Sequence, residues 1–431
     1  MHQSGHNLRA GTLHRYLTHN IISDFFYRMV CGCLVSFFLV ALGGWLVRIV
    51  VGDKREPVFN VYQLPGKFYY LKYFSMLLML HMRKIKSVAS VKNNENSILS
   101  LDEPQPLSSN EHAVDAVYFN GANTDTTWLV CGTARRKNNL VNGFLYLKIA
   151  DFSDRLLVSP RLPDTCMWQT EDELGWYEAE GLRLTPVVPM KKWKIEYQGV
   201  MRFENDPSQE MQVKLEAFWT TNLPYYNFAT DMDPKTVARA MAKELWSREY
   251  FQNLKKYHQT HYEHFGTLEG TVHIDDHSFS LSVDCMRDHS FGDQRNWKNF
   301  HRYIMHFVHL ENGDRITVGV ICMPVTFSWL EVGFITKSKE KRNIPITFVD
   351  FDLYQHGEQG NPPTDYALQF RTDENMYTMK VRVVSGPEFY IGEESECRIV
   401  EQLCRFEVNG LKGWGAAEWQ YRHHGGLPKR S

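Results

Sequence analysis

The sequence predicts a mainly β protein whose two β regions are joined by a helix and preceded by a membrane anchor. Three observations support this prediction: short runs of alternating apolar and polar residues, turn signals between these runs, and one charge-free apolar stretch near the N-terminus. At 431 residues, the chain is long enough for two folded units with appendages. Its net charge of -2 argues against a nucleic-acid partner, which would normally select a basic surplus.

The charge-free stretch runs from Met29 to Val47, after an N-terminal tail of residues 1–28. Nineteen apolar residues in a helix span about 28 Å, which is close to the hydrocarbon thickness of a bilayer. Apolar residues continue beyond Arg48, so we expect a single-pass transmembrane anchor at residues 29–51. A buried core helix is a poorer explanation at this length and hydrophobicity.

The charges that flank the anchor predict its orientation. Slightly more basic residues follow it than precede it, which favours a cytoplasmic body under the positive-inside rule. The chain also has no Asn-x-Ser/Thr glycosylation site, as expected of a body outside the secretory lumen. Nothing in the sequence indicates which membrane is involved.

Residues 52–112 are interpreted as a juxtamembrane amphipathic segment followed by a linker. The apolar run from Phe68 to Met82 is interrupted by Lys72 and is followed by a basic cluster, so it is too short and too polar to span a bilayer. A helix at residues 68–86 that lies in the membrane interface fits this pattern, with its basic end on anionic headgroups. A helix packed on the folded body is the alternative.

The first β region is expected at residues 113–232. In Trp193-Lys-Ile195-Glu-Tyr197 the apolar residues occupy alternate positions, which indicates a strand with one buried face. Short strands at regular spacing are typical of a barrel or a sandwich. Asp233 and Pro234 then supply an N-cap and a first-turn proline for a connecting helix at residues 233–265.

A second β region is expected at residues 266–431, where a hairpin turn is predicted at residues 311–314. Histidines 258, 261 and 264 invite a metal interpretation, but no nearby carboxylate or cysteine completes a set of ligands. The sequence therefore predicts no metal and no cofactor.

The richest chemistry lies in Arg287-Asp288-His289-Ser290-Phe291-Gly292, followed by Arg295 and Trp297. If this segment is extended, Arg287 and His289 face one side of the strand, and Asp288 and Ser290 face the other. A purely structural role is the alternative, in which Asp288 pairs with Arg287 or Arg295 as a salt bridge at a domain junction.

These motifs occur in a familiar order, together with Trp193 to Gly199, His261 to Gly266 and Gly413 to Arg422. The chain resembles the two-domain lipocalin-like (calycin) superfamily that includes carotenoid hydratase (hydroxyneurosporene synthase) and tocopherol cyclase. It is most similar to an uncharacterised branch with the signature Arg-Asp-His-Ser-Trp-Gly, then Arg-Asp-Trp. Phe291 replaces the first tryptophan of that pattern, and Asn296 replaces the second aspartate. The resemblance implies two lipocalin-like β-barrels with a polar cluster near their junction.

Two functions are compatible with this resemblance. The first is a membrane-anchored binding protein for a hydrophobic small molecule or lipid. The second is an enzyme that catalyses proton-initiated hydration, cyclisation or isomerisation of an isoprenoid-like substrate, with Asp288 as the acid and His289 or Arg287 tuning it. In either case, we expect the ligand to contact Trp219, Phe291, Arg295, Trp297, Trp414 and Glu418. Binding is favoured here, because two arginines beside Asp288 would lower its pKa and make it a poor proton donor.

Overall fold

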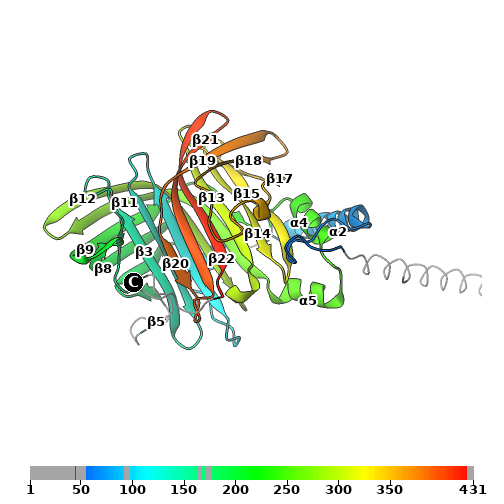
Figure 1. The fold of residues 1–431 in the computed structure, drawn as a ribbon, viewed down its shortest axis with the longest axis horizontal. Coiled ribbons are helices and arrows are strands. Elements are labelled where there is room, and N and C mark those ends of the chain that lie inside the picture. Colours follow the sequence, from blue (N-terminus) through cyan, green and yellow to red (C-terminus); the bar gives the residue numbers. More distant parts are fainter. Residues whose placement is uncertain (1–43, 45–54, 92–97, 163–166, 170–175, 425–431) are drawn as a thin grey trace, which may run out of the picture. The chain divides into compact units, whose positions relative to one another are not determined.

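The computed structural model describes residues 44, 55–91, 98–162, 167–169 and 176–424. The chain forms two compact units, and the larger, Arg55–Glu244 with Arg248–Ser431, holds every strand of the described residues. These strands belong to two antiparallel sheets, so the mainly β prediction is confirmed (Figure 1).

The first sheet contains a closed eight-stranded barrel, because β9 pairs with both β8 and β11. The strands follow one another around the ring in the order β1-β2-β3-β4-β8-β9-β11-β12. A closed antiparallel barrel of eight strands is the architecture of lipocalins. The strands of this sheet are β1 (Val114–Ala122), β2 (Trp128–Arg136), β3 (Leu140–Lys148), β4 (Leu157–Val158), β5 (Met167–Trp168), β6 (Tyr177–Ala179), β7 (Leu182–Val188), β8 (Lys192–Phe203), β9 (Asp206–Thr220), β10 (Tyr226–Asn227), β11 (Gln259–Ile274) and β12 (His277–Gly292).

The second sheet has ten strands and forms a half-barrel. Its two ends, β16 and β17, are consecutive in the sequence. Between them, the backbone N–H of Ile346 donates to Gly333 at 3.0 Å, and that of Thr347 donates to Arg371 at 2.7 Å. The strands are β13 (Arg302–Leu310), β14 (Arg315–Met323), β15 (Phe327–Lys337), β16 (Arg342–Pro345), β17 (Phe348–Asp350), β18 (Asp365–Arg371), β19 (Met376–Ser385), β20 (Glu388–Ile391), β21 (Cys397–Val408) and β22 (Leu411–Arg422).

The connection between the two β regions differs from the expected single helix at residues 233–265. It contains α4 (Pro234–Lys243), capped by Asp233 as predicted, and α5 (Arg248–Lys256). Residues 266–292, expected in the second β region, instead belong to β11 and β12 of the first barrel. Leu268, Val272 and Leu281 from this hairpin lie in the core of the first barrel. Such long-range strand pairing cannot be read from local periodicity.

Three apolar cores hold the sheets. One fills the first barrel, a second fills the half-barrel, and a third lies between the two sheets. Residues from β1, β2 and β3 in this third core meet residues from β13, β15 and β21. We call this region, where β1 also contacts β22, the junction.

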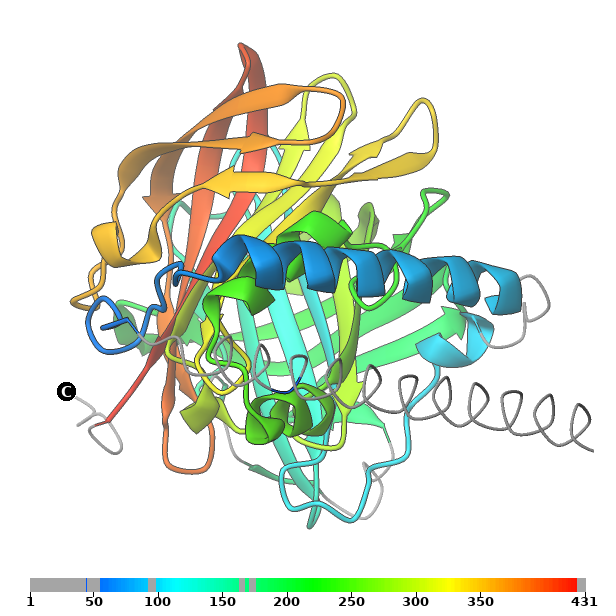
Figure 2. The same cartoon turned by 90° about the vertical axis from the view of Figure 1, so that its right-hand side faces the viewer.

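Helix α2 (Tyr69–Val91) packs against α4 (Figure 2). After it comes the short 3-10 helix η1 (Ser100–Asp102), and two further 3-10 helices, η2 (Trp297–Asn299) and η3 (Leu353–Gln355), lie within the second half of the chain. The interpretation of residues 52–112 as a segment with a plain linker therefore misses η1, whose Asp102 is fully buried.

The predicted transmembrane anchor at residues 29–51 lies outside the described residues except for Gly44, so it stays a prediction. In the part of the chain that the structure describes, no helix combines the length and apolar character needed to cross a bilayer.

Candidate functional site at the barrel junction

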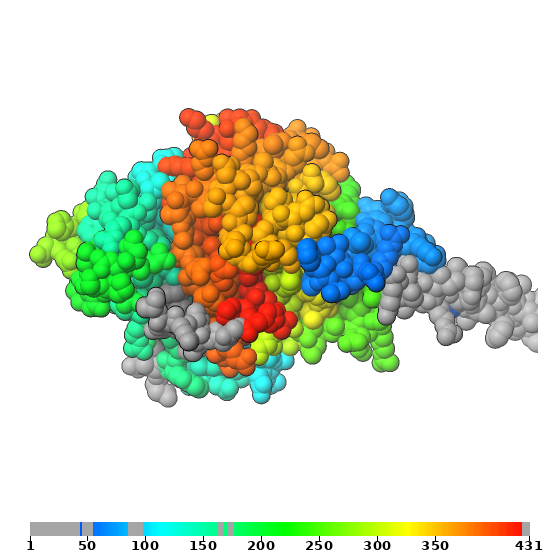
Figure 3. Space-filling view, in the orientation of Figure 1, coloured from blue at the N-terminus to red at the C-terminus, as the bar shows by residue number. Residues whose placement is uncertain are grey.

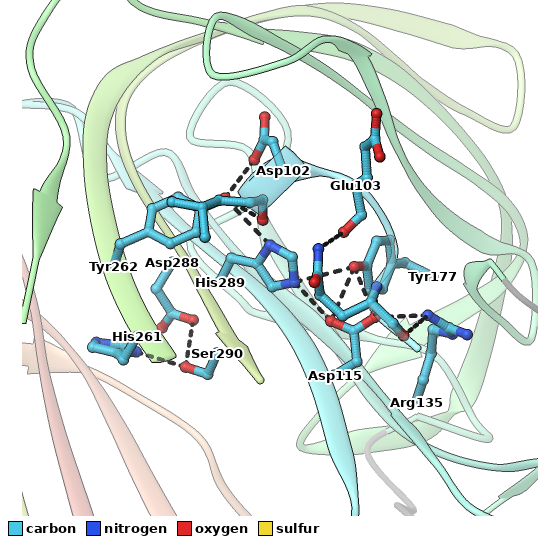
Figure 4. Close-up of polar contacts among 12 residues, drawn as sticks. Asp102, Glu103, Asp115, Arg135, Tyr177, His261, Tyr262, Asp288, His289 and Ser290 are labelled. Carbon is cyan, nitrogen blue, oxygen red and sulfur yellow. Dashed lines mark hydrogen bonds and ion pairs between the residues drawn. The ribbon is translucent and has the colours of Figure 1, made fainter. Parts of the chain in front are cut away.

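Strand β12 divides the polar motif between two environments, as period-two geometry requires. Opposite Arg287, Asp288 and His289 on β11 lie His264, Glu263 and Tyr262, respectively. Side chains at directly opposed positions of an antiparallel pair share a face. One set therefore points into the first barrel, and the other points to the junction (Figure 4).

Inside the barrel, Arg287 and Asp102 form an ion pair in which both side chains are fully buried, with Nη2 and Oδ1 2.6 Å apart. The guanidinium carbon lies 5.0 Å from the ring centre of Trp193 and 4.9 Å from that of Trp219, within cation–π range. Burial alone would raise the pKa of Asp102, but Arg287 and the hydroxyl of Tyr262 outweigh it, and the pKa is lowered.

His289 completes this inner cluster. Its Nε2 lies 2.7 Å from Oδ1 of Asp115, and its Nδ1 lies 3.2 Å from the hydroxyl of Tyr262. Asp115 also pairs with Arg135 at 2.6 Å and accepts a hydrogen bond from the hydroxyl of Tyr177 at 2.9 Å (Figure 4). Each charged group here has an opposite charge beside it, so the inner cluster is built to hold the barrel together.

The alternative interpretation of Asp288 as the salt-bridge partner of Arg287 is wrong. Arg287 binds Asp102, which is 185 residues away and belongs to the stretch interpreted as a linker. The physical reason is the alternation along β12, which places Asp288 on the other face from Arg287. In an extended segment, this alternation by itself keeps Asp288 from pairing with Arg287.

At the junction, two carboxyl groups face each other. Glu401 on β21 is directly opposite Glu418 on β22. The hydroxyl of Tyr118, from the first barrel, donates to Glu401, and that of Tyr303 donates to Glu418. Asn120 Nδ2 donates in turn to the Tyr118 hydroxyl at 2.8 Å, so the first barrel positions a donor on this carboxyl pair.

Burial and mutual repulsion keep the carboxyl pair protonated at higher pH than usual. Burial is the largest cause that raises the pKa of Glu418 to about 7; the hydrogen bond from Tyr303 opposes it, and the charge of Asp288 adds to it. The pKa of Glu401 is also raised, well above its ordinary value, by burial and then by the charge of Glu418. We infer that the pair retains a proton at neutral pH.

Asp288 and Glu263 extend this acidic cluster along the face of the first barrel. Burial raises the pKa of Asp288, while the neighbouring His261 and Arg295 act in the opposite direction. The pKa of Glu263 is also raised by burial, against a hydrogen bond with His261. Ser290 Oγ lies 3.4 Å from Asp288 and 2.6 Å from His261 Nδ1.

Arg295 is the arginine that lies near Asp288 in this acidic cluster. Burial lowers its pKa most strongly, and Asp288 counteracts that effect. Its Nε donates to Gln259 at 2.9 Å, and its guanidinium carbon lies 5.7 Å from the ring centre of Trp297. We call Glu263, Asp288, Arg295, Glu401 and Glu418, with Tyr118 and Tyr303, the junction cluster.

The structure separates the nine predicted site residues into two groups. Asp288, Arg295 and Glu418 belong to the junction cluster, with Trp297 beside Arg295, and Trp414 packs on the junction core. Arg287, His289 and Trp219 lie with the first barrel's inner cluster, and Phe291 contacts His289 at a centroid distance of 5.1 Å.

Four members of the junction cluster are not among the predicted site residues: Tyr118, Glu263, Tyr303 and Glu401. Glu401 could have been noticed, because it is an acid within the apolar run Ile399-Val-Glu-Gln-Leu-Cys404. Its pairing with Glu418 depends on the register of β21 against β22, which the sequence does not reveal.

Residues 37–421 match the family of unknown function DUF8627, so the chain belongs to this family. No curated protein matches it in sequence.

Solved structures with a similar arrangement include three proteins of low sequence identity. An AttH protein (NE1406) from Nitrosomonas europaea is 10% identical, with a TM-score of 0.47 over 74% of this chain and 95% of that one. Kievitone hydratase from Nectria haematococca is 11% identical, with a TM-score of 0.45 over 74% and 92%. CghA is 10% identical, with a TM-score of 0.41 over 75% and 97%. Similarity at this level assigns no activity to the chain.

The inner ion pair predicts the effect of replacing Asp102 with Asn. The substitution keeps the shape of the side chain but leaves Arg287 buried without a counter-charge. We expect the free energy of unfolding to fall by about 3 to 5 kcal/mol. Urea titration followed by circular dichroism measures this change.

Asp288→Asn is the matched control, since Asp288 is enclosed by the protein but, among the described residues, has no cation within ion-pair distance. Because its pKa is raised, its charge is unfavourable in the folded protein, and we expect unchanged or increased stability. Equal losses in the two variants would contradict the assignment of the ion pair.

The raised pKa of Glu418 predicts that the free energy of unfolding depends on pH. Its pKa is about 7 in the folded protein against an ordinary 4.5, so its contribution is complete below pH 4.5 and is lost as the pH rises through 7. The full difference corresponds to about 3 kcal/mol. Urea unfolding between pH 4.5 and 8 should show a weaker decline for Glu418→Gln than for the wild type. Glu407→Gln, on the exposed end of β21, should behave like the wild type.

Proposed function

We propose that the protein binds a hydrophobic small molecule at the junction cluster and transfers a proton to or from it. The observation that carries this proposal is the facing carboxyl pair of Glu401 and Glu418. Glu401 is buried and Glu418 is half-buried, both accept hydrogen bonds from tyrosines, and the pair lies beside the apolar core between the two sheets.

The partial exposure of the junction cluster supports the proposal that a ligand can reach it. Asp288, Arg295, Tyr303 and Glu418 are only half-buried, yet burial is the largest cause of the pKa shift in each of them. Groups on an open surface keep their hydration, and groups in a packed core keep no exposed area. This combination is expected of side chains that line an enclosed space reached by water.

The interior of the first barrel offers less room for a ligand. The space that a lipocalin uses for its ligand is occupied here by an apolar core and by the inner cluster. Around the junction cluster, by contrast, many apolar side chains are only partly buried. They include Phe144, Phe300, Ile321, Leu330, Ile391 and Trp414. These residues would form an apolar wall around the ligand.

The carboxyl pair suits general acid–base catalysis. An acid is most effective when its pKa lies near the working pH, and the pKa of Glu418 is about 7. Protonation of a carbon–carbon double bond moves the proton of Glu418 onto one carbon and leaves a cation on the other. Carboxylates and aromatic faces nearby would stabilise that cation.

The reaction closes when a base removes a proton. In isomerisation or cyclisation, the proton leaves a carbon next to the cation; in hydration, it leaves the water that has attacked the cation. The carboxylate formed at the pair takes up that proton, so the site returns to its starting state. Asp288 acts as a positioning residue here, because its charge raises the pKa of Glu418.

This assignment moves the acid from Asp288 to the pair of Glu401 and Glu418, and it leaves Arg287 and His289 with the structure of the first barrel. The main reason for preferring a binding protein was that two arginines would lower the pKa of Asp288. In the structure its pKa is raised instead. The resemblance to carotenoid hydratase and tocopherol cyclase supports isoprenoid-like double bonds as the substrate class.

The test is deuterium transfer from solvent. The full chain, purified in detergent, would be incubated in D2O with a lipid extract, and the extracted compounds would be compared by mass spectrometry. We expect one class of hydrophobic compound to gain non-exchangeable deuterium. Glu418→Gln should still bind this compound but should transfer deuterium about a hundredfold more slowly or less.

Glu407→Gln is the matched control and should retain the full rate. A compound that co-purifies with the protein and gains no deuterium would make the protein a carrier or sensor of that ligand. The absence of both binding and labelling would overturn the proposal.

A further inference from the structure

Helix α2 turns a large apolar face outward. Tyr70, Phe74, Leu78 and Met82, spaced four residues apart, are exposed by 71%, 61%, 62% and 49%. Leu71 and Met79 widen this stripe and are exposed by 52% and 46%. We call these six residues the α2 stripe; at the helical rise it is about 18 Å long. In water, an apolar surface of this kind marks an interaction site.

The opposite face of α2 is fixed to the body of the protein. Lys72 is only 2% exposed, and its Nζ donates to the backbone oxygen of Glu244 at 3.1 Å, while Met76 is buried. The helix therefore buries a lysine and presents phenylalanine and leucine to the outside. This is the reverse of an ordinary surface helix, whose apolar side faces the core. In Figure 3, the blue atoms of residues 55–91 lie at the edge of the described body, beside yellow and orange atoms.

The charges along this segment have one sign. No aspartate or glutamate occurs between Pro57 and Asn94, whereas Lys67 precedes α2 and Arg83, Lys84 and Lys86 lie in its last turns. An apolar stripe that ends in a basic cluster fits a bilayer with anionic headgroups. An identical copy of this segment would bring like charges together, so it is a poorer partner.

We propose that α2 lies in the plane of an anionic membrane surface, with the α2 stripe inserted at the boundary between headgroups and acyl chains. Phe59 and Leu64, exposed by 62% and 38%, extend the apolar surface before the helix. The charge-free residues 29–47 precede α2 by only about twenty positions, which would keep the helix beside the same bilayer. The body is then held at the surface through a folded element as well as through the predicted anchor.

Lipid photocrosslinking of the full chain tests this proposal. The protein would be reconstituted into vesicles of phosphatidylcholine and phosphatidylserine that contain a lipid with a diazirine on its acyl chain. After irradiation, mass spectrometry of peptides locates the crosslinks. We expect crosslinks within residues 70–82 and fewer of them when phosphatidylserine is omitted. Peptides from β19, which carries the exposed Met376, should remain free of lipid.

Three sets of variants separate the contributions of the stripe and of its flanking charges from the rest of the chain. Phe74→Asp with Leu78→Asp should abolish the α2 crosslinks, while crosslinks within residues 29–51 persist if the anchor spans the bilayer. Met376→Asp is the matched control, because it changes an exposed apolar residue elsewhere, and it should leave the α2 crosslinks unchanged. Lys67→Glu with Arg83→Glu should remove the dependence on phosphatidylserine.

Two results would overturn the proposal. One is an absence of lipid crosslinks within residues 70–82 in vesicles where residues 29–51 are labelled. The other is a crosslink from this helix to a second copy of the chain in place of lipid, which would make the α2 stripe a self-association surface.

Discussion

The two-residue period of β12 is the constraint on which both polar clusters depend. Because successive side chains point to opposite faces, the same four-residue motif supplies Arg287 and His289 to the barrel interior and Asp288 and Ser290 to the junction. The two environments then diverge. In the interior, Arg287 pairs with Asp102 and Arg135 pairs with Asp115, while the junction gathers more carboxyl groups than cations. Protonation of carboxyl groups at the junction relieves the repulsion among these excess acids.

The half-barrel contains an ion pair that resembles the pair of Arg287 and Asp102 in the first barrel. Arg302 on β13 lies over the rings of Trp419 and Tyr421, at 5.6 and 4.8 Å, and pairs with Glu358 at 2.7 Å. Tyr62, from the segment before α2, donates to the same carboxylate at 2.6 Å. Each sheet thus holds a buried arginine stacked on aromatic rings and paired with a carboxylate from a connecting segment. Glu401 and Glu418 at the junction belong to neither of these ion pairs. Because these two acids are not needed for either pair, we propose that their role is functional.

Local signals in the sequence predicted local structure well. Asp233 caps α4 as expected, and the predicted hairpin at residues 311–314 lies between β13 and β14, with Gly313 at a φ of 93°. Two features that depend on long-range pairing could not be predicted from the sequence. They are the membership of β11 and β12 in the first barrel and the ion pair of Arg287 with Asp102. For the same reason, the partnership of Glu418 with Glu401 could not be predicted, because their contact is created only by the strand register.

The central claim is that the pair of Glu401 and Glu418 carries a proton at neutral pH. Infrared spectroscopy of the protein labelled with 13C-glutamate measures this directly, because a protonated buried carboxyl gives a carbonyl band distinct from that of a carboxylate. We predict such a band at pH 7, a decline of the band as the pH rises above 7, and a changed titration in Glu418→Gln. A spectrum at pH 7 that shows ionised glutamates alone would contradict the account.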